Sequence, residues 1–184
     1  GLMEDKIINE IINRKSSLNF SNEKITKDEI NILIEATKWA PSSRNMQPWK
    51  VIFVSNESIS YEPLFNSLSE SNKEWASNCT LFAIFCVEDD KRLNKKFLDV
   101  GYAGQNLMLQ SERLKIQTHP MGGWSEEKVK EAIKIPAENH VVFILAMGKE
   151  GNLENLNEDL KERHNKLRTR NPIEENFSFD FWKF

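Results

Sequence analysis

The sequence predicts a single α+β domain in which helices cover both faces of a β-sheet. Three apolar runs, at residues 49–55, 80–88 and 141–148, are rich in β-branched and aromatic residues, which favours strands. Each run is apolar at both alternating sets of positions, as is typical of strands buried on both faces. The chain of 184 residues is long enough for one domain, 1–184, with a substantial core.

Two helices are predicted before the first strand. Over residues 3–13, one helical face gathers four isoleucines, which are Ile7, Ile8, Ile11 and Ile12. Thr26 and Glu29 form the T-x-x-E pattern of a capping box, which marks the start of a second helix. We expect this helix to end near Ala40, because Pro41 follows and disfavours helical backbone in the residue before it.

Two more helices are predicted after the second apolar run. Residues 92–115 are nearly free of helix-breaking residues and indicate one long buried helix. Gly101 and Gly104 are one turn apart in it, so we expect another backbone to approach closely there. A further helix is expected to begin at the N-cap Ser125 and to run to about Lys134.

Three remaining stretches show weaker patterns. Residues 119–124, HPMGGW, are predicted to be a break that joins two helices. Residues 149–171 are polar and charged, with little periodicity. The last stretch, NFSFDFWKF, alternates Phe177, Phe179 and Phe181 with polar residues, which predicts an amphipathic strand.

Composition narrows the classes of function. The net charge of −3 argues against a nucleic-acid partner, because phosphate binding over a broad surface requires a basic excess. No apolar run approaches the roughly 20 residues of a membrane helix, so no membrane span is predicted. The first twelve residues lack a basic region ahead of an apolar stretch, so we predict no secretory signal.

The cysteines and histidines predict neither a disulfide nor a metal site. Cys79 and Cys86 would point to opposite faces if they lay on one strand, because their separation is odd. The sequence contains no C-x-x-C, and its three histidines are far apart along the chain. We therefore expect a reduced, cytoplasmic protein without a metal.

Four polar clusters interrupt the predicted core elements. They are Arg14-Lys15-Ser16, residues 41–49, residues 119–124 and residues 168–172. Each has an ordinary explanation when taken alone: a helix end, a turn between helix and strand, a glycine cap, and solvated charge.

The order and spacing of these clusters resemble the FMN-dependent nitroreductase family over about residues 5–176. The motifs are R-x-S-x-x-x-F at 14–20, A-P-S-S-x-N-x-Q-P-W at 40–49, D-x-G-x-A-x-Q-N-L at 99–107, P-M-G-G-W at 120–124 and R-x-R-x-P at 168–172. The second and third motifs are each fairly specific, and all five in one order make coincidence improbable.

The resemblance implies a mixed, mainly antiparallel sheet flanked by helices on both faces, in an intertwined homodimer with FMN at the subunit interface. It implies that five residues surround the FMN phosphate: Arg14, Lys15, Ser16, Arg168 and Arg170. Guanidinium groups suit a phosphate because they form charge-assisted hydrogen bonds.

The flavin ring would be held by two loops. The resemblance implies that Pro41, Ser42, Ser43, Asn45 and Gln47 contact a flavin bound mainly by the other subunit. The backbone of Pro120, Met121, Gly122 and Gly123 would lie alongside the ring, with an N–H near the hydride-accepting N5. No catalytic side chain is implied, since the cofactor supplies the chemistry.

One position departs from the family's pattern. Leu18 stands where the family usually has a basic residue near the N1/O2 edge of the flavin. Lys73 is a candidate replacement, because its segment approaches that edge in relatives. Three other motif members, Asp99, Gln105 and Asn106, and two of the five tryptophans, Trp49 and Trp124, are expected to have structural roles.

The implied activity is a two-step transfer from NAD(P)H to an electron-poor acceptor such as a nitroaromatic or a quinone. The alternative is a flavin carrier or sensor that does not turn over nicotinamide. A lid over the flavin would have to come from residues 56–79, so an open pocket is expected. The arm of residues 177–184 would add to the partner's sheet, or else fold back onto its own chain.

Overall fold

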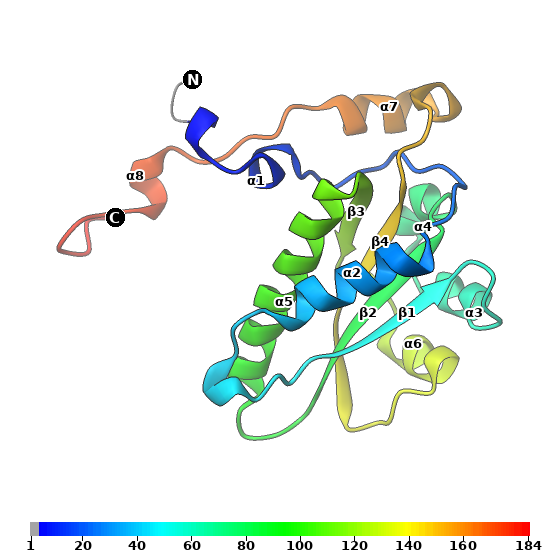
Figure 1. The fold of residues 1–184 in the computed structure, drawn as a ribbon, viewed down its shortest axis with the longest axis horizontal. Coiled ribbons are helices and arrows are strands. Elements are labelled where there is room, and N and C mark those ends of the chain that lie inside the picture. Colours follow the sequence, from blue (N-terminus) through cyan, green and yellow to red (C-terminus); the bar gives the residue numbers. More distant parts are fainter. Residues whose placement is uncertain (1–3) are drawn as a thin grey trace.

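A computed structural model describes residues 4–184 and has an α+β architecture (Figure 1). Its sheet has the strand order β1-β2-β4-β3, and every ladder between these strands is antiparallel. The strands are β1 (Lys50–Ser55), β2 (Leu81–Glu88), β3 (Ile116–Met121) and β4 (Asn139–Lys149). The predicted fold class is thus confirmed, and three of the strands match the three apolar runs.

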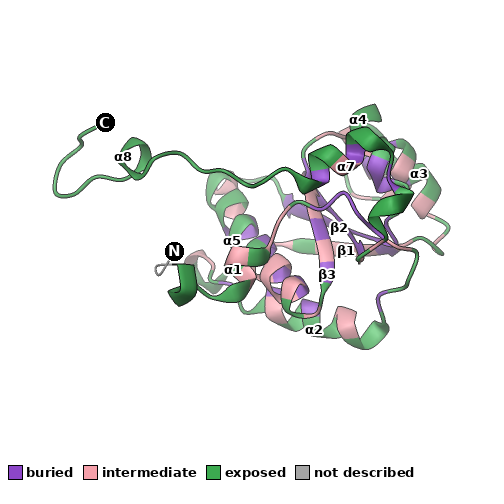
Figure 2. Cartoon of the chain, turned by 90° about the horizontal axis from the view of Figure 1, so that it is seen from above, coloured by how far each residue is buried: buried purple, intermediate pink, exposed green. Residues whose placement is uncertain are grey.

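The sheet is buried on both faces because its central strand β2 carries apolar side chains at alternating positions on each side. Leu81, Ala83, Phe85 and Val87 of β2 pack under α2 (Lys27–Lys38) and α5 (Leu93–Arg113). Phe82, Ile84 and Cys86 face the opposite core, which is covered by α3 (Tyr61–Asn66), α4 (Glu70–Ala76), α6 (Glu126–Ile133) and α7 (Glu158–Asn165). Figure 2 shows this buried centre between exposed outer helices.

The strand β3 was not predicted, and the break expected over residues 119–124 begins only after Met121. β3 is an edge strand: it pairs with β4, with His119 opposite Ala146 and Pro120 opposite Leu145, and its other side makes an isolated bridge from Thr118 to Ser16. An edge position tolerates a proline and polar residues, which is why the segment lacks the pattern of a central strand.

The helix predictions around the sheet are confirmed. In the capping box of α2, Glu29 N–H donates to Thr26 Oγ1 at 3.1 Å, and Thr26 N–H donates to Glu29 Oε1 at 2.9 Å. Ser125 caps α6, where its hydroxyl accepts from Lys128 N–H at 3.4 Å. The 21-residue α5 corresponds to the long helix predicted over residues 92–115.

The two glycines of α5 behave differently from the prediction. A Cβ on Gly104 would lie 2.7 Å from Phe143 Cζ, so an aromatic ring, not a backbone, occupies the space. Gly101 has no atom within 4 Å of the corresponding point in this chain. The prediction of close backbone packing is therefore wrong for Gly104. At Gly101, no backbone of the described chain approaches the position of a Cβ.

The N-terminal helix is shorter than predicted. It consists of the 3₁₀ turn η1 (Glu4–Lys6) and α1 (Asn9–Asn13), and residue 3 lies outside the described residues. Ile7, Ile8 and Ile11 remain exposed at 38%, 56% and 44%, because the described part of the chain covers this apolar face only partly.

Residues 149–171 contain more structure than their polarity indicated. The 3₁₀ turn η3 (Leu153–Asn155) precedes α7, and Leu156, Leu160 and His164 are buried at four-residue intervals. This i, i+4, i+8 spacing was the available signal, but it rests on only two apolar residues among many charges.

The C-terminal tail forms no strand in the single chain. After α8 (Ile173–Asn176), residues 177–184 extend away from the body of the protein (Figures 1 and 2). The predicted strand is absent from the isolated chain, because among residues 4–184 no strand lies beside the tail to supply backbone hydrogen bonds, and its addition to a partner's sheet stays a prediction. The tail does not fold back either.

The segment between β1 and β2 is part of the core. Leu64 of α3 and Trp75 of α4 are 0% and 1% exposed. Cys79 and Cys86 are both buried free thiols, and Cys79 precedes β2 instead of sharing a strand with Cys86. Among residues 4–184, no helix has the length and apolar character needed to cross a bilayer.

Candidate functional site

The first polar cluster is attached to the edge strand β3. Ser16 forms a parallel bridge with Thr118, and Ser17 N–H donates to the Thr118 carbonyl at 2.9 Å. His119 Nδ1 lies 2.8 Å from the Ser17 carbonyl and donates to it, while the His119 ring stacks on Trp75 with centroids 4.0 Å apart. Residues 14–17 are thus held beside the strand that leads into residues 120–123.

Three arginines from opposite ends of the chain gather next to this attachment. Burial lowers the pKa of Arg14, and the guanidinium groups of Arg168 and Arg170 lower it further, while Glu112 partly offsets them. Arg168 also donates a hydrogen bond to the Ile12 carbonyl. A cluster of positive charges favours a bound anion, and guanidinium groups suit a phosphate.

The helix α7 supports the same segment from the other side. Lys15 Nζ donates to the His164 carbonyl at 2.5 Å, and Leu18 N–H donates to His164 Nδ1 at 3.1 Å. Burial lowers the pKa of His164, and the charge of Lys15 lowers it further. Sequence reasoning missed His164, because its position beside Lys15 depends on the packing of α7.

Leu18 is buried, with only 4% of its surface exposed, and it packs in the core with Phe20 and Trp75. This position therefore contributes no charge to the site. The apolar residue fits its surroundings, since a basic side chain in the same place would have to be desolvated.

The two glycines after β3 present free backbone donors. The N–H groups of Gly122 and Gly123 make no hydrogen bond within the described part of the chain. Gly123 is held by its carbonyl, which accepts from Ser69 N–H at 3.0 Å and from Asn72 Nδ2 at 3.1 Å. Gly122 is exposed and has open space around its Cα.

Lys73 follows Asn72 on the helix α4, which contacts Gly123. Its ammonium group forms an ion pair with Glu70 at 3.0 Å, and its side chain is 24% exposed. The structure thus places Lys73 on the element that touches Gly123, although its charge is already paired with an exposed carboxylate.

The loop of residues 41–47 has an unusual backbone. Arg44, Asn45 and Gln47 have positive φ angles of 53°, 55° and 49°. Left-handed backbone at non-glycine residues is uncommon and persists where surrounding contacts enforce it. Within the loop, Gln47 N–H donates to Ser42 Oγ at 3.1 Å and Asn45 N–H donates to the Ser42 carbonyl at 3.0 Å.

The buried carboxylate of Asp99 fixes this loop to α5. Ser43 N–H donates to Asp99 Oδ2 at 3.2 Å, and Arg92 Nη2 donates to Ser43 Oγ at 2.8 Å. The structural role expected for Asp99 is confirmed, as is that of Asn106, whose Nδ2 donates to the Ala36 carbonyl at 2.9 Å. Gln105 is exposed and makes no such contact. Trp49 and Trp124 pack against the two cores, as expected.

One chain does not bring the loop to the arginines. The loop is bound to Asp99, whereas Arg14 lies near Glu112, thirteen residues further along α5. Thirteen residues of α-helix span about 20 Å. The structure therefore places residues 14–16, 168 and 170 toward one end of α5, beside the strand that continues into residues 120–123, and leaves residues 41–47 at the other end.

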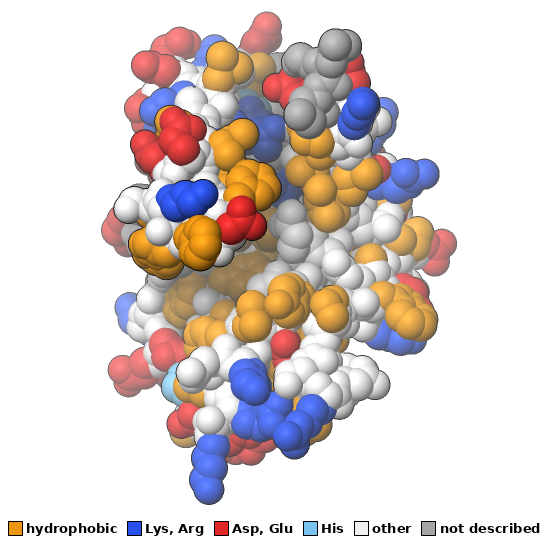
Figure 3. Space-filling model, turned by 90° about the vertical axis from the view of Figure 1, so that its left-hand side faces the viewer, with side chains coloured by type: hydrophobic (Ala, Val, Ile, Leu, Met, Phe, Trp, Pro, Cys, Tyr) orange, Lys and Arg blue, Asp and Glu red, His pale blue; other side chains and the backbone are white. Residues whose placement is uncertain are grey.

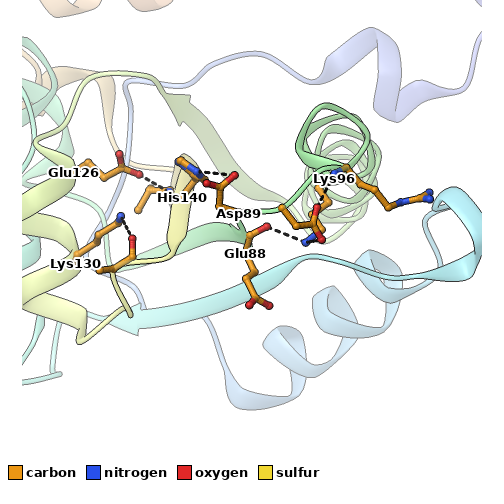
Figure 4. A network of polar contacts seen from close by, with 10 residues as sticks. Glu88, Asp89, Lys96, Glu126, Lys130 and His140 are labelled. Atoms are coloured by element: carbon orange, nitrogen blue, oxygen red, sulfur yellow. Dashed lines mark hydrogen bonds and ion pairs between the residues drawn. The ribbon is translucent and has the colours of Figure 1, made fainter.

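The charged residues at the far end of β2 form a structural network (Figure 4). Lys96 Nζ donates to the Glu88 carbonyl at 2.9 Å, and Glu126 accepts from Val141 N–H at 2.7 Å. Asp89 and His140 lie 3.6 Å apart. These charges bind chain segments to one another, so the network is not a second candidate site.

The sequence comparison defines the class of protein. The Nitroreductase family model matches residues 11–83 and 70–149, and the chain belongs to this family.

Individual relatives are distant in sequence but similar in fold. The chain is 24% identical over 168 residues to an FMN reductase (NADPH) of Bacillus subtilis, and the match covers 79% of this chain and 66% of that protein's length. It superposes with a TM-score of 0.87 on an oxidoreductase containing FMN, at 24% identity over 96% of this chain and 93% of the other. A nitroreductase of Desulfovibrio desulfuricans in complex with FMN gives 0.77, at 17% identity over 95% and 96% of the two chains.

The histidine that joins β3 to the first cluster predicts a pH-dependent stability. Burial lowers the pKa of His119 below the ordinary value of 6.5, with the nearby Arg163 adding to the effect, and burial does the same for His164. The unfolded chain therefore binds these protons more readily, so stability is present above about pH 6.5 and decreases as the pH falls below it. Urea denaturation between pH 7.5 and 5.5 should show this loss.

The variant His119→Asn keeps an N–H donor but does not titrate in this range. We expect a less stable protein at pH 7.5, because the stacking on Trp75 is lost, and a smaller decrease between pH 7.5 and 5.5. An unchanged decrease in the variant would show that His119 does not contribute.

Proposed function

We propose that the protein is an FMN-dependent oxidoreductase that transfers electrons from NAD(P)H to an electron-poor acceptor. The observation that carries the proposal is the convergence of Arg14, Arg168 and Arg170 beside the strand that ends in the free N–H groups of Gly122 and Gly123. A phosphate carries about −1.5 to −2 charge at neutral pH and matches the arginines. A flavin ring that lies alongside residues 120–123 can accept hydrogen bonds from the unpaired N–H groups of Gly122 and Gly123.

Each group of the site has a distinct task in this proposal. Arg14, Lys15, Ser16, Arg168 and Arg170 bind the phosphate, and the backbone of Pro120, Met121, Gly122 and Gly123 orients the ring. When bound, FMN supplies the hydride and electron transfer, so no catalytic side chain is required. Lys73 is proposed to lie at the N1/O2 edge in place of the basic residue that Leu18 replaces.

The proposal includes a homodimer with FMN at the interface. The loop of Pro41, Ser42, Ser43, Asn45 and Gln47 lies at the far end of α5 from the arginines, so a second copy is the natural source of the loop for each site. Exposed apolar side chains also gather on the side from which the tail extends (Figure 3). Trp182 and Phe179 in the tail are 85% and 81% exposed, and such patches mark interaction surfaces.

The finer points of the activity belong to the proposal. Nitroaromatics or quinones are the proposed acceptors, and donor and acceptor use the same site in turn in a ping-pong sequence. The Bacillus subtilis relative that is named for NADPH supports a nicotinamide donor. A cytoplasmic location stays a prediction. The alternative function is that of a flavin carrier or sensor.

Residues 56–79, the segment that could form a lid over the flavin, pack into the core. The open pocket is therefore kept as part of the proposal.

The visible spectrum of the purified protein without oxygen tests the activity. We expect yellow protein that bleaches on addition of NADH or NADPH and recovers its colour with a quinone or a nitroaromatic. Yellow protein that stays yellow with both nucleotides would favour the carrier or sensor. Colourless protein that takes up no added FMN would contradict both.

The arginine cluster predicts selectivity for FMN over riboflavin. Of the groups of the flavin, the proposal has Arg168 contact the phosphate alone, so Arg168→Gln should lower FMN affinity roughly tenfold or more while riboflavin affinity stays the same. Flavin fluorescence quenching measures both. Lys166→Gln, at a nearby exposed position, is the matched control, and an equal loss of riboflavin binding in R168Q would oppose the phosphate assignment.

The tail predicts a contribution to dimerisation. Deletion of residues 177–184 removes the exposed aromatic side chains, and we expect a weaker dimer or a monomer in sedimentation experiments, with weaker FMN binding. A truncated protein that remains a tight dimer would count against exchange of the arm between subunits.

A further inference from the structure

The segment that follows α1 contains three of the residues proposed to bind the flavin phosphate, which are Arg14, Lys15 and Ser16. Its position is fixed from two sides. On one side, the backbone of Ser17 is bound to β3. On the other side, the segment contacts His164 in the last turn of α7 (Figure 1). A residue that holds the segment from this side also determines where the phosphate-binding groups lie.

His164 binds the segment through two of its atoms. Its carbonyl accepts from Lys15 Nζ at 2.5 Å, and its Nδ1 accepts from Leu18 N–H at 3.1 Å. His164 and Leu18 are both buried, at 8% and 4% exposure. In the described part of the chain, the Leu18 N–H has no other acceptor. An ammonium group has three donors, so Lys15 keeps two for a phosphate.

The bond to Leu18 requires a neutral imidazole. A backbone N–H can only donate, so Nδ1 must be unprotonated and the ring proton must lie on Nε2. Burial lowers the pKa of His164 below the ordinary value of 6.5, the charge of Lys15 lowers it further, and Glu150 partly offsets them. The ring is therefore neutral at neutral pH. A proton on Nδ1 would face the Leu18 N–H, and because two donors cannot bond to each other, the hydrogen bond would be lost.

Ionisable groups lie on each of the elements next to His164. They are Lys15 on the segment, Glu150 after β4, Arg163 on α7 with its partners Asp159 and Glu74 of α4, and His119 on β3. Arg163 is paired with its two carboxylates at 3.5 and 3.6 Å, so its charge is largely compensated. A proton on His164 would thus add a positive charge next to Lys15. Since His119 also titrates below pH 6.5 and binds Ser17, a test has to change His164 alone.

We propose that His164 is a positioning residue for the flavin phosphate, and that its neutral ring is required to hold residues 14–18 in the conformation that binds FMN. This role rests on the proposed function, in which residues 14–16 bind the phosphate. Protonation of His164 releases the Leu18 N–H, so the segment moves away from α7 and its donors no longer converge on one phosphate. FMN affinity is then high at neutral pH and low at acidic pH, whereas riboflavin, which has no phosphate, is affected much less.

Two variants of His164 separate the hydrogen bond from the titration. In His164→Asn the amide Oδ1 takes the place of Nδ1 as the acceptor, so FMN affinity at pH 7.5 should stay within about twofold of the native value. His164→Leu leaves the buried Leu18 N–H unpaired, and FMN affinity should fall roughly tenfold. His140→Leu is the matched control. His140 pairs with Val87 at the far end of β2, so this variant should change neither the FMN affinity nor its pH profile.

The pH profile of flavin binding tests the titration. Fluorescence quenching measures the affinities for FMN and riboflavin between pH 7.5 and 5.5. The FMN phosphate itself takes up a proton near pH 6, which weakens binding to the native chain and to every variant alike. We expect the FMN affinity of the native chain to fall roughly fivefold more than that of H164N over this range, with little change for riboflavin in either protein. The contribution of His119 is common to both proteins.

Histidine NMR of the full chain, with and without FMN, tests the coupling directly. Without FMN at pH 7.5, we expect the proton of the His164 ring on Nε2. Coupling between two binding events is reciprocal, so FMN should lower the pKa of His164 if protonation weakens FMN binding. A phosphate that acted on His164 only through its negative charge would raise this pKa instead.

Three results would overturn this role while leaving the FMN site in place: a neutral His164 ring with its proton on Nδ1, a His164 pKa that FMN raises, or equal pH profiles in the native chain and H164N. Absence of FMN binding by the native chain at pH 7.5 would overturn the proposed function and this role with it. The pH and NMR measurements use the native chain and H164N, so they do not depend on the folding of H164L.

Discussion

The attachment of residues 16 and 17 to the edge strand β3 is the constraint on which the rest of the site depends. Ser17 is bound through both its backbone groups, by the N–H to Thr118 and by the carbonyl from His119. This attachment sets Arg14 beside the strand that continues into Gly122 and Gly123. Without it, the guanidinium groups and the free backbone donors would belong to separate parts of the surface.

The second constraint is the length of α5. Thirteen positions along this helix separate Asp99, which holds the loop, from Glu112 near the arginines, so the two proposed half-sites lie apart in one chain. The strained loop needs the buried carboxylate to hold it, because left-handed backbone at Arg44 and Gln47 is not an intrinsic preference of these residues. A complete site needs the loop and the arginines close together, and this is the physical reason for proposing a dimer.

Local sequence signals predicted the helices and strands whose formation depends mainly on neighbouring residues. The capping box at Thr26 needs only neighbouring residues, and β2 is apolar on both faces wherever it lies in the sheet. The strand β3 and the helix α7 were missed because each depends on a neighbour to complete its burial. The tail shows the converse: its alternating phenylalanines favour a strand, but no strand of the same chain is available to pair with it.

The sequence by itself determined the fold class and the family, and it predicted the residues of the candidate site, because hydrophobic periodicity, caps and motif spacing are properties of the chain order. Only the tertiary structure decided that Leu18 is buried and that His164 supports Lys15. These features join residues from distant parts of the chain, and their energies depend on burial and distance, which arise only when the sheet has formed.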